Sequence, residues 1–134
     1  MALLPRRGVL AVAAVIDVAL HAGRRPVSAK VLAGRHGLPP RHLEPVLQAL
    51  VHTGILRGIR GPRGGYELAR EEHLITTDDV LRAAGSADED LPITQSDLVT
   101  TIVMPALAEA ERSFSTALRG ISIADLRRRA AELG

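Results

Sequence analysis

Arg57, Arg60 and Arg63 lie close together at the start of residues 57–70, whose sequence is RGIRGPRGGYELAR. Gly61, Pro62, Gly64 and Gly65 predict a tight reversal of the chain, flanked by two short strands. Arg57, Arg60 and Arg63 could then hold a phosphate group, and the bare backbone at Gly61 could lie against it. The alternative is an ordinary hairpin with solvated arginines, and this segment alone does not decide between the two.

Two predicted helices precede the hairpin and have the pattern of a helix-turn-helix. Ser28 is a good N-cap for a short helix over residues 29–35, which Gly37 ends. The next helix carries apolar residues at helical spacing, namely Leu43, Val46, Leu47, Leu50 and Val51, and Gly54 closes it. Its opposite face carries Arg41, Glu44, Pro45, Gln48 and His52. That face is available to a nucleic-acid groove. The alternative is that it is simply exposed to solvent, as the polar face of an average helix is.

Further helices are predicted on both sides of this unit. Residues 8–21 form a first helix, and Thr76 with Asp79 at capping-box spacing begins another that runs to about residue 84. Ser96 caps a long helix, and Ser122 with Asp125 caps a last one. The expected fold is therefore mainly α. It comprises a winged helix-turn-helix with a two-stranded wing over residues 1–84, an acidic linker over 85–95 and dimerisation helices over 96–134.

The long helix carries an apolar stripe that one small domain cannot cover. Its members are Val99, Val103, Leu107, Ala110, Phe114 and Leu118. The simplest partner is the same helix of a second subunit in a two-fold dimer, and the alternative is packing back onto the same chain. Pro105 falls inside the pattern and predicts a kink or a restart of the helix.

The composition of the chain excludes some classes of function and favours others. The chain of 134 residues has no cysteine, which excludes disulfides, thiolate catalysis and cysteine-ligated metal centres. Residues 1–70 hold 11 Lys and Arg against 3 Asp and Glu, a net charge of +8, whereas the remainder holds 6 against 12, a net charge of −6. A basic half of this kind attracts phosphate through its field and through counterion release.

The N-terminal apolar run, residues 9–20, has two interpretations. Arg6 and Arg7 precede it as they would precede the core of a secretory signal. Asp17 interrupts the run, however, and the run is too short to span a bilayer. We therefore expect a buried first helix in a cytoplasmic protein without a membrane segment.

No catalytic or metal-binding constellation is visible. The histidines, His21, His36, His42, His52 and His73, fall on separate predicted elements without metal-ligand spacing. No Ser/His/Asp ordering stands out either, so the chain is not expected to be an enzyme. We expect His36 and His73 to be exposed and His21 to lie at a helix end.

Several segments resemble a known bacterial family over nearly the whole chain. PVSAKVLA, HLEPVLQALVHTGIL, RGPRGGYELAR, LITTDDVLRA and the final ISIADL are similar to the Rrf2 family of winged-helix transcription regulators. The resemblance implies a homodimer with a long dimerisation helix that represses or activates at a palindromic operator. It places Ser28 and Lys30 near the DNA backbone, Arg41, His42 and Glu44 at the start of the recognition helix, and Arg60, Gly61 and Arg63 in the wing.

Two departures from the family pattern limit this transfer. Members that sense iron-sulfur clusters hold them with cysteines before the long helix, whereas residues 85–107 here contain neither cysteine nor histidine. Asp88, Glu89 and Asp90 would be hard ligands for a soft cluster, so no cofactor is expected. Pro45 also lies in the recognition helix, where it lacks the amide that would bond to Arg41, so the first turn should kink or the helix should start later.

The sequence thus predicts a sequence-specific DNA-binding regulator, a homodimeric repressor at a palindromic operator. The residues expected to contact duplex DNA are Ser28, Lys30, Arg41, His42, Glu44, Gln48, Arg57, Arg60, Gly61 and Arg63. The alternative is a winged helix used as a protein-interaction module, with its acidic half docking a basic partner. The signal stays open between a small-molecule effector in a pocket between the linker and the long helix, a partner protein, and none.

Overall fold

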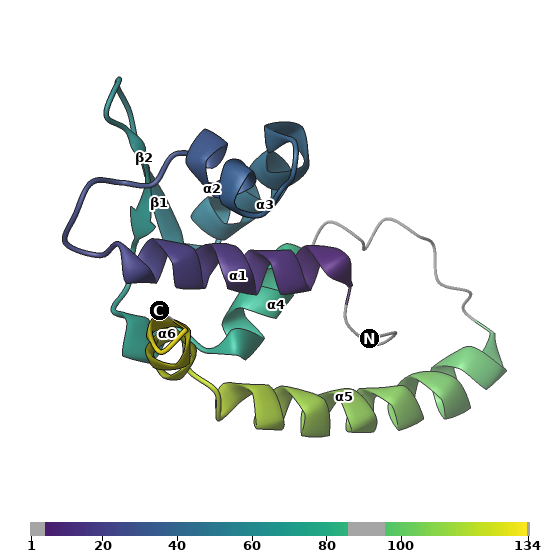
Figure 1. Ribbon diagram of the computed structural model, residues 1–134. Helices are drawn as coiled ribbons and strands as arrows, with labels where there is room; N and C mark the ends of the chain where they lie inside the picture. The colour runs from purple at the N-terminus through teal and green to yellow at the C-terminus, as the bar shows by residue number, and fades with distance from the viewer. Residues whose placement is uncertain (1–4, 86–95, 134) are drawn as a thin grey trace.

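The computed structural model describes residues 5–85 and 96–133, so most of the predicted acidic linker lies outside the described residues. The elements are α1 (Arg6–Leu20), α2 (Ala29–Arg35), α3 (Pro40–His52), β1 (Leu56–Ile59), β2 (Gly65–Leu68), η1 (Glu72–Leu74), α4 (Thr77–Gly85), η3 (Leu98–Val103), α5 (Met104–Arg119) and α6 (Ile123–Ala131). Figure 1 shows α1 in the middle, with the strands, α2 and α3 on one side and α5 and α6 on the other. The mainly helical fold with a two-stranded wing confirms the predicted class.

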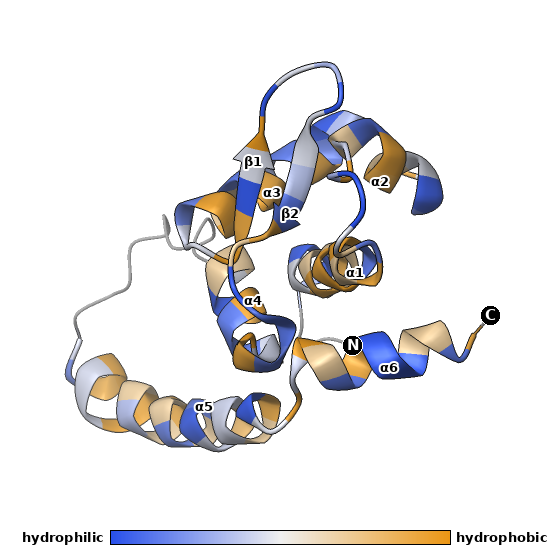
Figure 2. Cartoon of the chain, turned by 90° about the vertical axis from the view of Figure 1, so that its left-hand side faces the viewer, coloured by the Kyte–Doolittle hydropathy of each residue, from blue (hydrophilic) through white to orange (hydrophobic). Residues whose placement is uncertain are grey.

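The core forms where α1, α3 and α4 meet. Its largest fully buried side chains are aliphatic, as the scarcity of aromatic residues requires, and they include Leu32, Leu43, Leu47, Leu50 and Ile75. Small residues such as Ala11 and Ala14 let α1 approach its neighbours closely. Figure 2 shows hydrophobic residues, in orange, on the helices of this region.

A backbone bridge attaches the wing to the loop before α2. β1 and β2 pair antiparallel, with Leu56 opposite Leu68 and Ile59 opposite Gly65. Val27 and Tyr66 exchange two backbone hydrogen bonds, of 2.9 and 2.8 Å. A Cβ on Gly65 would lie 2.5 Å from the carbonyl carbon of Val27, so only glycine permits this approach. The base of the wing, which we call the wing root, is therefore held in place by the bridge between Val27 and Tyr66.

A buried carboxylate clamps α2 onto α1. Asp17 is only 7% exposed, and Arg35 of α2 donates a hydrogen bond to its Oδ1. His21 and His36 approach the same carboxylate at 3.4 and 3.5 Å. His36 is half-buried rather than exposed as expected, because its ring lies beside the buried carboxylate of Asp17, whereas His73 is exposed as expected.

Two helices contain a proline for which the sequence predicted alternatives: a kink or a later start at Pro45, and a kink or a restart at Pro105. α3 begins at Pro40 and continues through Pro45, so a later start is wrong. Pro40 takes a first-turn position, where its missing amide costs no helical bond, and only Pro45 withholds one from the carbonyl of Arg41. Near Pro105 the helix changes type, from the π-helical η3 to the α-helical α5 at Met104, which matches the predicted restart.

Helix α6 does not extend the long helix away from the core. Ser122 and Asp125 form the predicted capping box, and Ile123 directly after the cap is fully buried in the core. The backbone amide of Ile123 donates to the carbonyl of Ile75 at 2.9 Å. α6 therefore packs against α1, although the sequence groups it with the dimerisation segment; the apolar contact of Ile123 decides its position.

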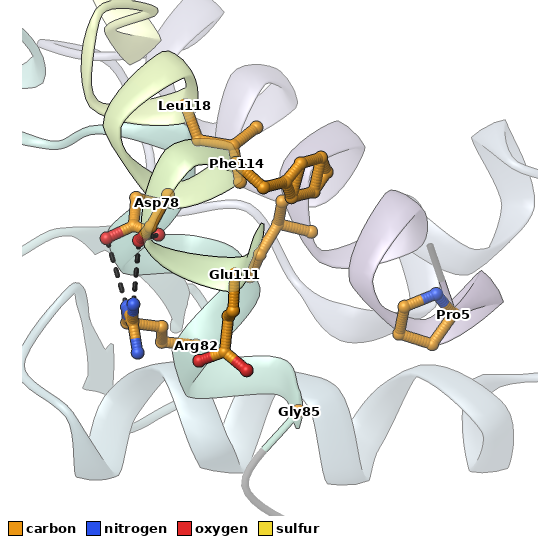
Figure 3. Close-up of a pocket in the computed structure, with 9 residues that line it drawn as sticks. Pro5, Asp78, Arg82, Gly85, Glu111, Phe114 and Leu118 are labelled. Carbon is orange, nitrogen blue, oxygen red and sulfur yellow. Dashed lines mark hydrogen bonds and ion pairs between the residues drawn. The ribbon is translucent and has the colours of Figure 1, made fainter. Parts of the chain in front are cut away.

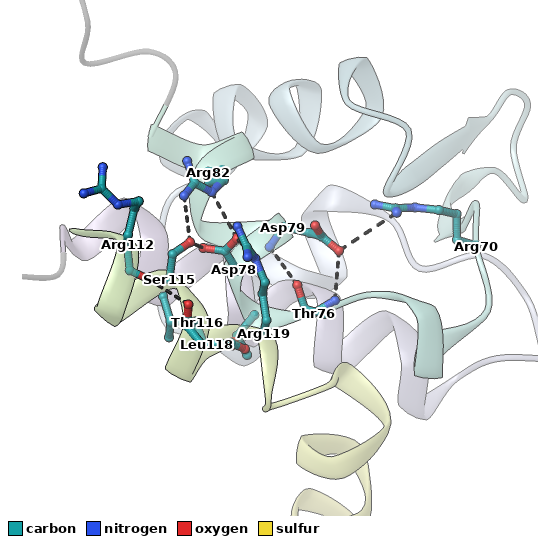
Figure 4. A network of polar contacts seen from close by, with 11 residues as sticks. Arg70, Thr76, Asp78, Asp79, Arg82, Arg112, Ser115, Thr116, Leu118 and Arg119 are labelled. Carbon is teal, nitrogen blue, oxygen red and sulfur yellow. Dashed lines mark hydrogen bonds and ion pairs between the residues drawn. The ribbon is translucent and has the colours of Figure 1, made fainter. Parts of the chain in front are cut away.

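A second buried carboxylate joins α4 to α5 (Figure 4). The Ser115 hydroxyl donates to Asp78 Oδ1, and Arg82 donates to both, at 3.0 Å to Asp78 Oδ2 and 2.7 Å to Ser115 Oγ. Arg119 Nε lies 3.4 Å from Asp78 Oδ2. Burial acts to raise the pKa of Asp78, but the hydrogen bonds from Ser115 and Arg82 and the charges of Arg82 and Arg119 outweigh it, so the pKa lies below its usual value.

This network predicts a pH-dependent contribution of Ser115 to stability. Because the pKa of Asp78 is lowered on folding, the stabilisation is present above the unfolded pKa of about 3.9 and is lost as the pH falls through the folded pKa. Ser115→Ala should therefore lower the free energy of unfolding by about 1–2 kcal/mol at pH 7 and by less below about pH 4. Urea denaturation at both pH values measures this.

The matched control is Ser113→Ala, an exposed serine on the same helix. It should leave the free energy of unfolding unchanged within about 0.5 kcal/mol. Equal effects of the two substitutions at pH 7, or an effect of Ser115→Ala that stays constant down to low pH, would contradict the assigned role.

Candidate nucleic-acid interface

Helix α3, the predicted recognition helix, is positioned by its buried stripe. Leu43, Val46, Leu47 and Leu50 are all buried against the core. The sequence-predicted residues Arg41, His42, Glu44 and Gln48 are all exposed on the side turned away from it. This face combines hydrogen-bond donors and acceptors, which is what readout of base edges in a major groove requires.

Helix α2 presents the predicted backbone contacts beside α3. The Ser28 hydroxyl accepts a hydrogen bond from the amide of Val31 at 3.1 Å, which caps the helix as expected. Lys30 in the first turn is exposed. α2 packs against α3, and Leu32 and Ala33 bury the contact, so the two helices form one unit.

The conformation of the wing turn requires glycine at two positions. Gly61 has φ +106°, and the Gly64 amide donates to the Gly61 carbonyl at 2.9 Å. A Cβ on Gly64 would lie 2.0 Å from the carbonyl oxygen of Ile59, so the turn is too tight for any other residue. Arg60 and Arg63 flank this turn and both are exposed.

Ion pairing separates the cations of the basic half into two groups. Arg57 is paired with Glu67 across the wing at 2.6 Å, and Arg70 approaches Asp79 at 4.0 Å. In the part of the chain that the structure describes, a second group has no carboxylate within ion-pair distance: Arg6, Arg24, Arg25, Lys30, Arg41, Arg60 and Arg63. Apart from Arg6 at the start of α1, this group lies on the loop before α2, on α2, at the start of α3 and on the wing.

Arg24 and Arg25 are not among the residues that the sequence predicts to contact DNA. They line a hollow together with Arg63 of the wing turn. The available signal was the dibasic pair directly before Pro26, in a loop that leads into the helix-turn-helix. Its proximity to the wing depends on the Val27 bridge to Tyr66, which no local pattern predicts.

A separate cavity of about 350 Å³ lies between α4 and α5 (Figure 3). Leu81, Phe114 and Leu118 form its apolar walls, and Arg82 and Glu111 supply polar groups. The Asp78 network closes one side, so the cavity adjoins the joint between the winged helix and the long helix.

The apolar stripe predicted for dimerisation lies along η3 and α5. Leu107 is 63% exposed, and Val103, Ala110 and Phe114 are exposed too, while Val99 and Leu118 are partly covered. Leu98, Ile102 and Met104 extend the same apolar surface. Within the described residues, this surface exceeds the scattered exposed apolar residues elsewhere on the chain, such as Val9 and Leu74.

Comparison with known proteins gives a consistent result. The family model for Rrf2, described as an iron-dependent transcriptional regulator, matches residues 4–129. An HTH-type transcriptional regulator of Synechocystis sp. is 33% identical over 86% of this chain and 80% of its own length. The HTH-type transcriptional regulator IscR of Vibrio campbellii is 35% identical over 69% of this chain, which spans only 53% of that protein.

Solved structures agree on the fold. IscR of T. potens superposes with a TM-score of 0.76 at 31% identity, over 97% of this chain and 89% of its own. CymR of B. subtilis, described as a global cysteine regulator, superposes with a TM-score of 0.71 at 23% identity, over 94% and 96%. These similarities indicate a DNA-binding regulator rather than an enzyme. No helix among the described residues is long and apolar enough to cross a membrane.

An iron-sulfur cluster, which the iron dependence in the family's description suggests, does not fit a chain without cysteine. Iron-sulfur clusters need thiolate ligands, and the chain has no cysteine. Within residues 5–85 and 96–133, no group of three or more histidine and carboxylate side chains is arranged to hold a metal ion. We therefore carry over only the winged-helix fold and DNA binding. The family match over residues 4–129 and the similarity to these regulators show that the chain belongs to the Rrf2 family of transcriptional regulators.

Proposed function

We propose that the chain works as a homodimer that represses transcription at a palindromic operator. The observation that carries the proposal is the cluster of cations without carboxylate partners on α2, α3 and the wing. In a dimer, two α3 helices would enter successive major grooves, where Arg41, Glu44 and Gln48 read base edges. His42 would add a contact at the start of the helix, and a regulator of this kind would act in the cytoplasm.

The remaining predicted contacts would position the protein without reading sequence. Ser28, Lys30, Arg60 and Arg63 would hold phosphates, and Gly61 would let the wing backbone approach the duplex. Arg57 would contribute least, because Glu67 already neutralises it at 2.6 Å. We refer to the exposed side of α3, with Arg41, Glu44 and Gln48, as the reading face. The operator sequence does not follow from this arrangement, because Pro45 lies within the reading face.

A small-molecule effector is the third part of the proposal, and the cavity between α4 and α5 is where it would bind. Apolar walls with two charged groups suit a small amphipathic molecule. A ligand there would contact both sides of the Asp78 network and could change the angle between α4 and α5. Native mass spectrometry of the purified protein would reveal such a ligand as an added mass that is lost on denaturation.

The two kinds of proposed DNA contact should have different effects on binding. Base contacts should set the preference for the operator, and phosphate contacts should set the salt dependence. Once selection from genomic fragments has given an operator, Arg41→Ala should weaken operator binding by about 1–3 kcal/mol and reduce the preference over random DNA. Arg60→Ala should weaken binding to both DNAs equally and reduce the salt slope of log affinity by about 0.9. Fluorescence anisotropy over a salt series measures both quantities.

Arg129→Ala on α6 serves as the control, because it removes an exposed arginine far along the chain from the reading face. It should leave the preference for the operator unchanged. If wild-type protein bound its operator no better than random DNA, the alternative of a protein-interaction module would replace this proposal.

The exposed stripe predicts the oligomeric state. Leu107→Glu would place a carboxylate in the dimer interface, and an uncompensated buried charge costs roughly 3 kcal/mol or more. We therefore expect the dissociation constant of the dimer to rise by at least about 100-fold in sedimentation equilibrium. Leu74→Glu is the matched control, because Leu74 is similarly exposed, at 59%, but lies on η1. A monomeric wild-type protein, or a Leu107→Glu dimer of unchanged affinity, would overturn the assignment.

A further inference from the structure

A hollow of about 520 Å³ separates the wing turn from the loop before α2. Arg24 and Arg25 line it from the loop, and Arg63 lines it from the wing. All three are exposed, and no acidic residue is among the described residues that line the hollow. We refer to this place, with Arg24, Arg25 and Arg63, as the arginine hollow.

The fold holds the two walls of the arginine hollow at a fixed separation. The paired hydrogen bonds between Val27 and Tyr66 connect the loop to the wing root directly below it. The close approach at Gly65 and the fixed φ of Pro26 restrict the same segment. The arginines therefore project from a rigid frame, which lowers the entropy that binding would cost them.

The charge of the arginine hollow is not neutralised within the described chain. Arg35 also lines it, but Asp17 pairs with that guanidinium and compensates its charge. Arg24, Arg25 and Arg63 have no such partner among the described residues. Three guanidinium groups together match the oxygens of phosphodiesters, which they bind by charge-assisted hydrogen bonds.

We propose that the arginine hollow binds backbone phosphates of duplex DNA, on the flank of the site that α3 reads. The inference rests on the proposed function, because it assumes that α3 and the wing face a duplex. The wing, α2 and α3 lie on the same side of α1, so one duplex could contact them together (Figures 1 and 2). The hollow is open rather than enclosed, which suits a continuous strand better than a free anion.

The loop before α2 would then position the protein on DNA without a preference for any base sequence. Phosphate contacts fix the register of a protein on DNA but carry no base information. Arg24 and Arg25 should therefore contribute equally to binding of operator and of random DNA. Their contribution should appear in the salt dependence, because each phosphate contact releases condensed counterions.

The test compares two double variants of the full chain that remove the same charge. Arg24→Ala/Arg25→Ala removes the loop pair, and Arg128→Ala/Arg129→Ala removes a neighbouring pair from α6. Affinity for the operator and for a random duplex is measured between about 50 and 200 mM salt. We expect the loop variant to reduce the salt slope by about 1.8, for two contacts, with an unchanged ratio of operator to random affinity. The α6 variant should keep the wild-type slope.

A conservative variant separates charge from folding. Arg24→Lys/Arg25→Lys keeps both charges, so it should retain most of the wild-type slope. Duplexes with neutral methylphosphonate linkages on the operator flank should weaken wild-type binding but leave the binding of the alanine variant unchanged. Circular dichroism of each variant confirms that the fold is retained.

The outcomes distinguish this inference from the proposed function. If the wild-type protein binds DNA but the loop and α6 variants have equal slopes, the arginine hollow is not a phosphate site. A loss of operator preference in the loop variant, with unchanged binding to random DNA, would also overturn the inference. If the wild-type protein itself shows no salt-dependent DNA binding, the proposed function fails first.

Discussion

The buried carboxylate of Asp17 determines where the helix-turn-helix sits on the rest of the molecule. It lies on α1, the helix against which α3, α4 and α6 pack. A carboxylate that is 7% exposed would cost several kcal/mol if it had no partner, and the guanidinium of Arg35 supplies that partner. Because Arg35 ends α2, satisfying the charge of Asp17 also fixes the position of α2. The orientation of α3 follows through its contact with α2.

Asp78 has the same role at the other end of the winged helix. Its carboxylate joins α4 to α5 through Ser115 and Arg82, so the long helix leaves the domain in a defined direction. In a dimer the distance between two reading helices would depend on this joint. Two buried carboxylates, at Asp17 and Asp78, therefore connect the reading face to the apolar stripe of α5. The cavity beside Asp78 adjoins the second of these joints.

Local signals predicted most element boundaries, because capping depends on residues three positions apart. Ser28, the pair Thr76 and Asp79, and the pair Ser122 and Asp125 all cap helices as expected. Contacts between distant segments were not predictable in this way. Asp17 was visible only as an interruption of an apolar run, and its pairing with Arg35 spans 18 residues.

The features that the sequence did not predict have the same origin. The return of α6 onto α1 depends on the burial of Ile123, and one buried residue makes no periodic pattern. The helix through Pro45 persists because its apolar stripe is buried, which outweighs the loss of one backbone hydrogen bond. Arg24 and Arg25 join the wing only through the bridge between Val27 and Tyr66, 39 residues apart in the chain.

Charge pairing also bears on the choice between DNA and a protein partner. In the acidic half, the described carboxylates that are at least partly buried are paired with arginine: Glu72 with Arg127, Asp78 with Arg82 and Arg119, Asp79 with Arg70, and Asp125 with Arg128. These four acids are compensated within the fold, whereas the exposed acids Asp97, Glu109, Glu111 and Glu132 have no ion-pair partner among the described residues. Carboxylate partners are likewise absent there for cations of the loop before α2, of α2, of α3 and of the wing turn, namely Arg24, Arg25, Lys30, Arg41, Arg60 and Arg63. Uncompensated positive charge on these neighbouring elements favours a polyanion, which supports phosphate as the partner of the basic half.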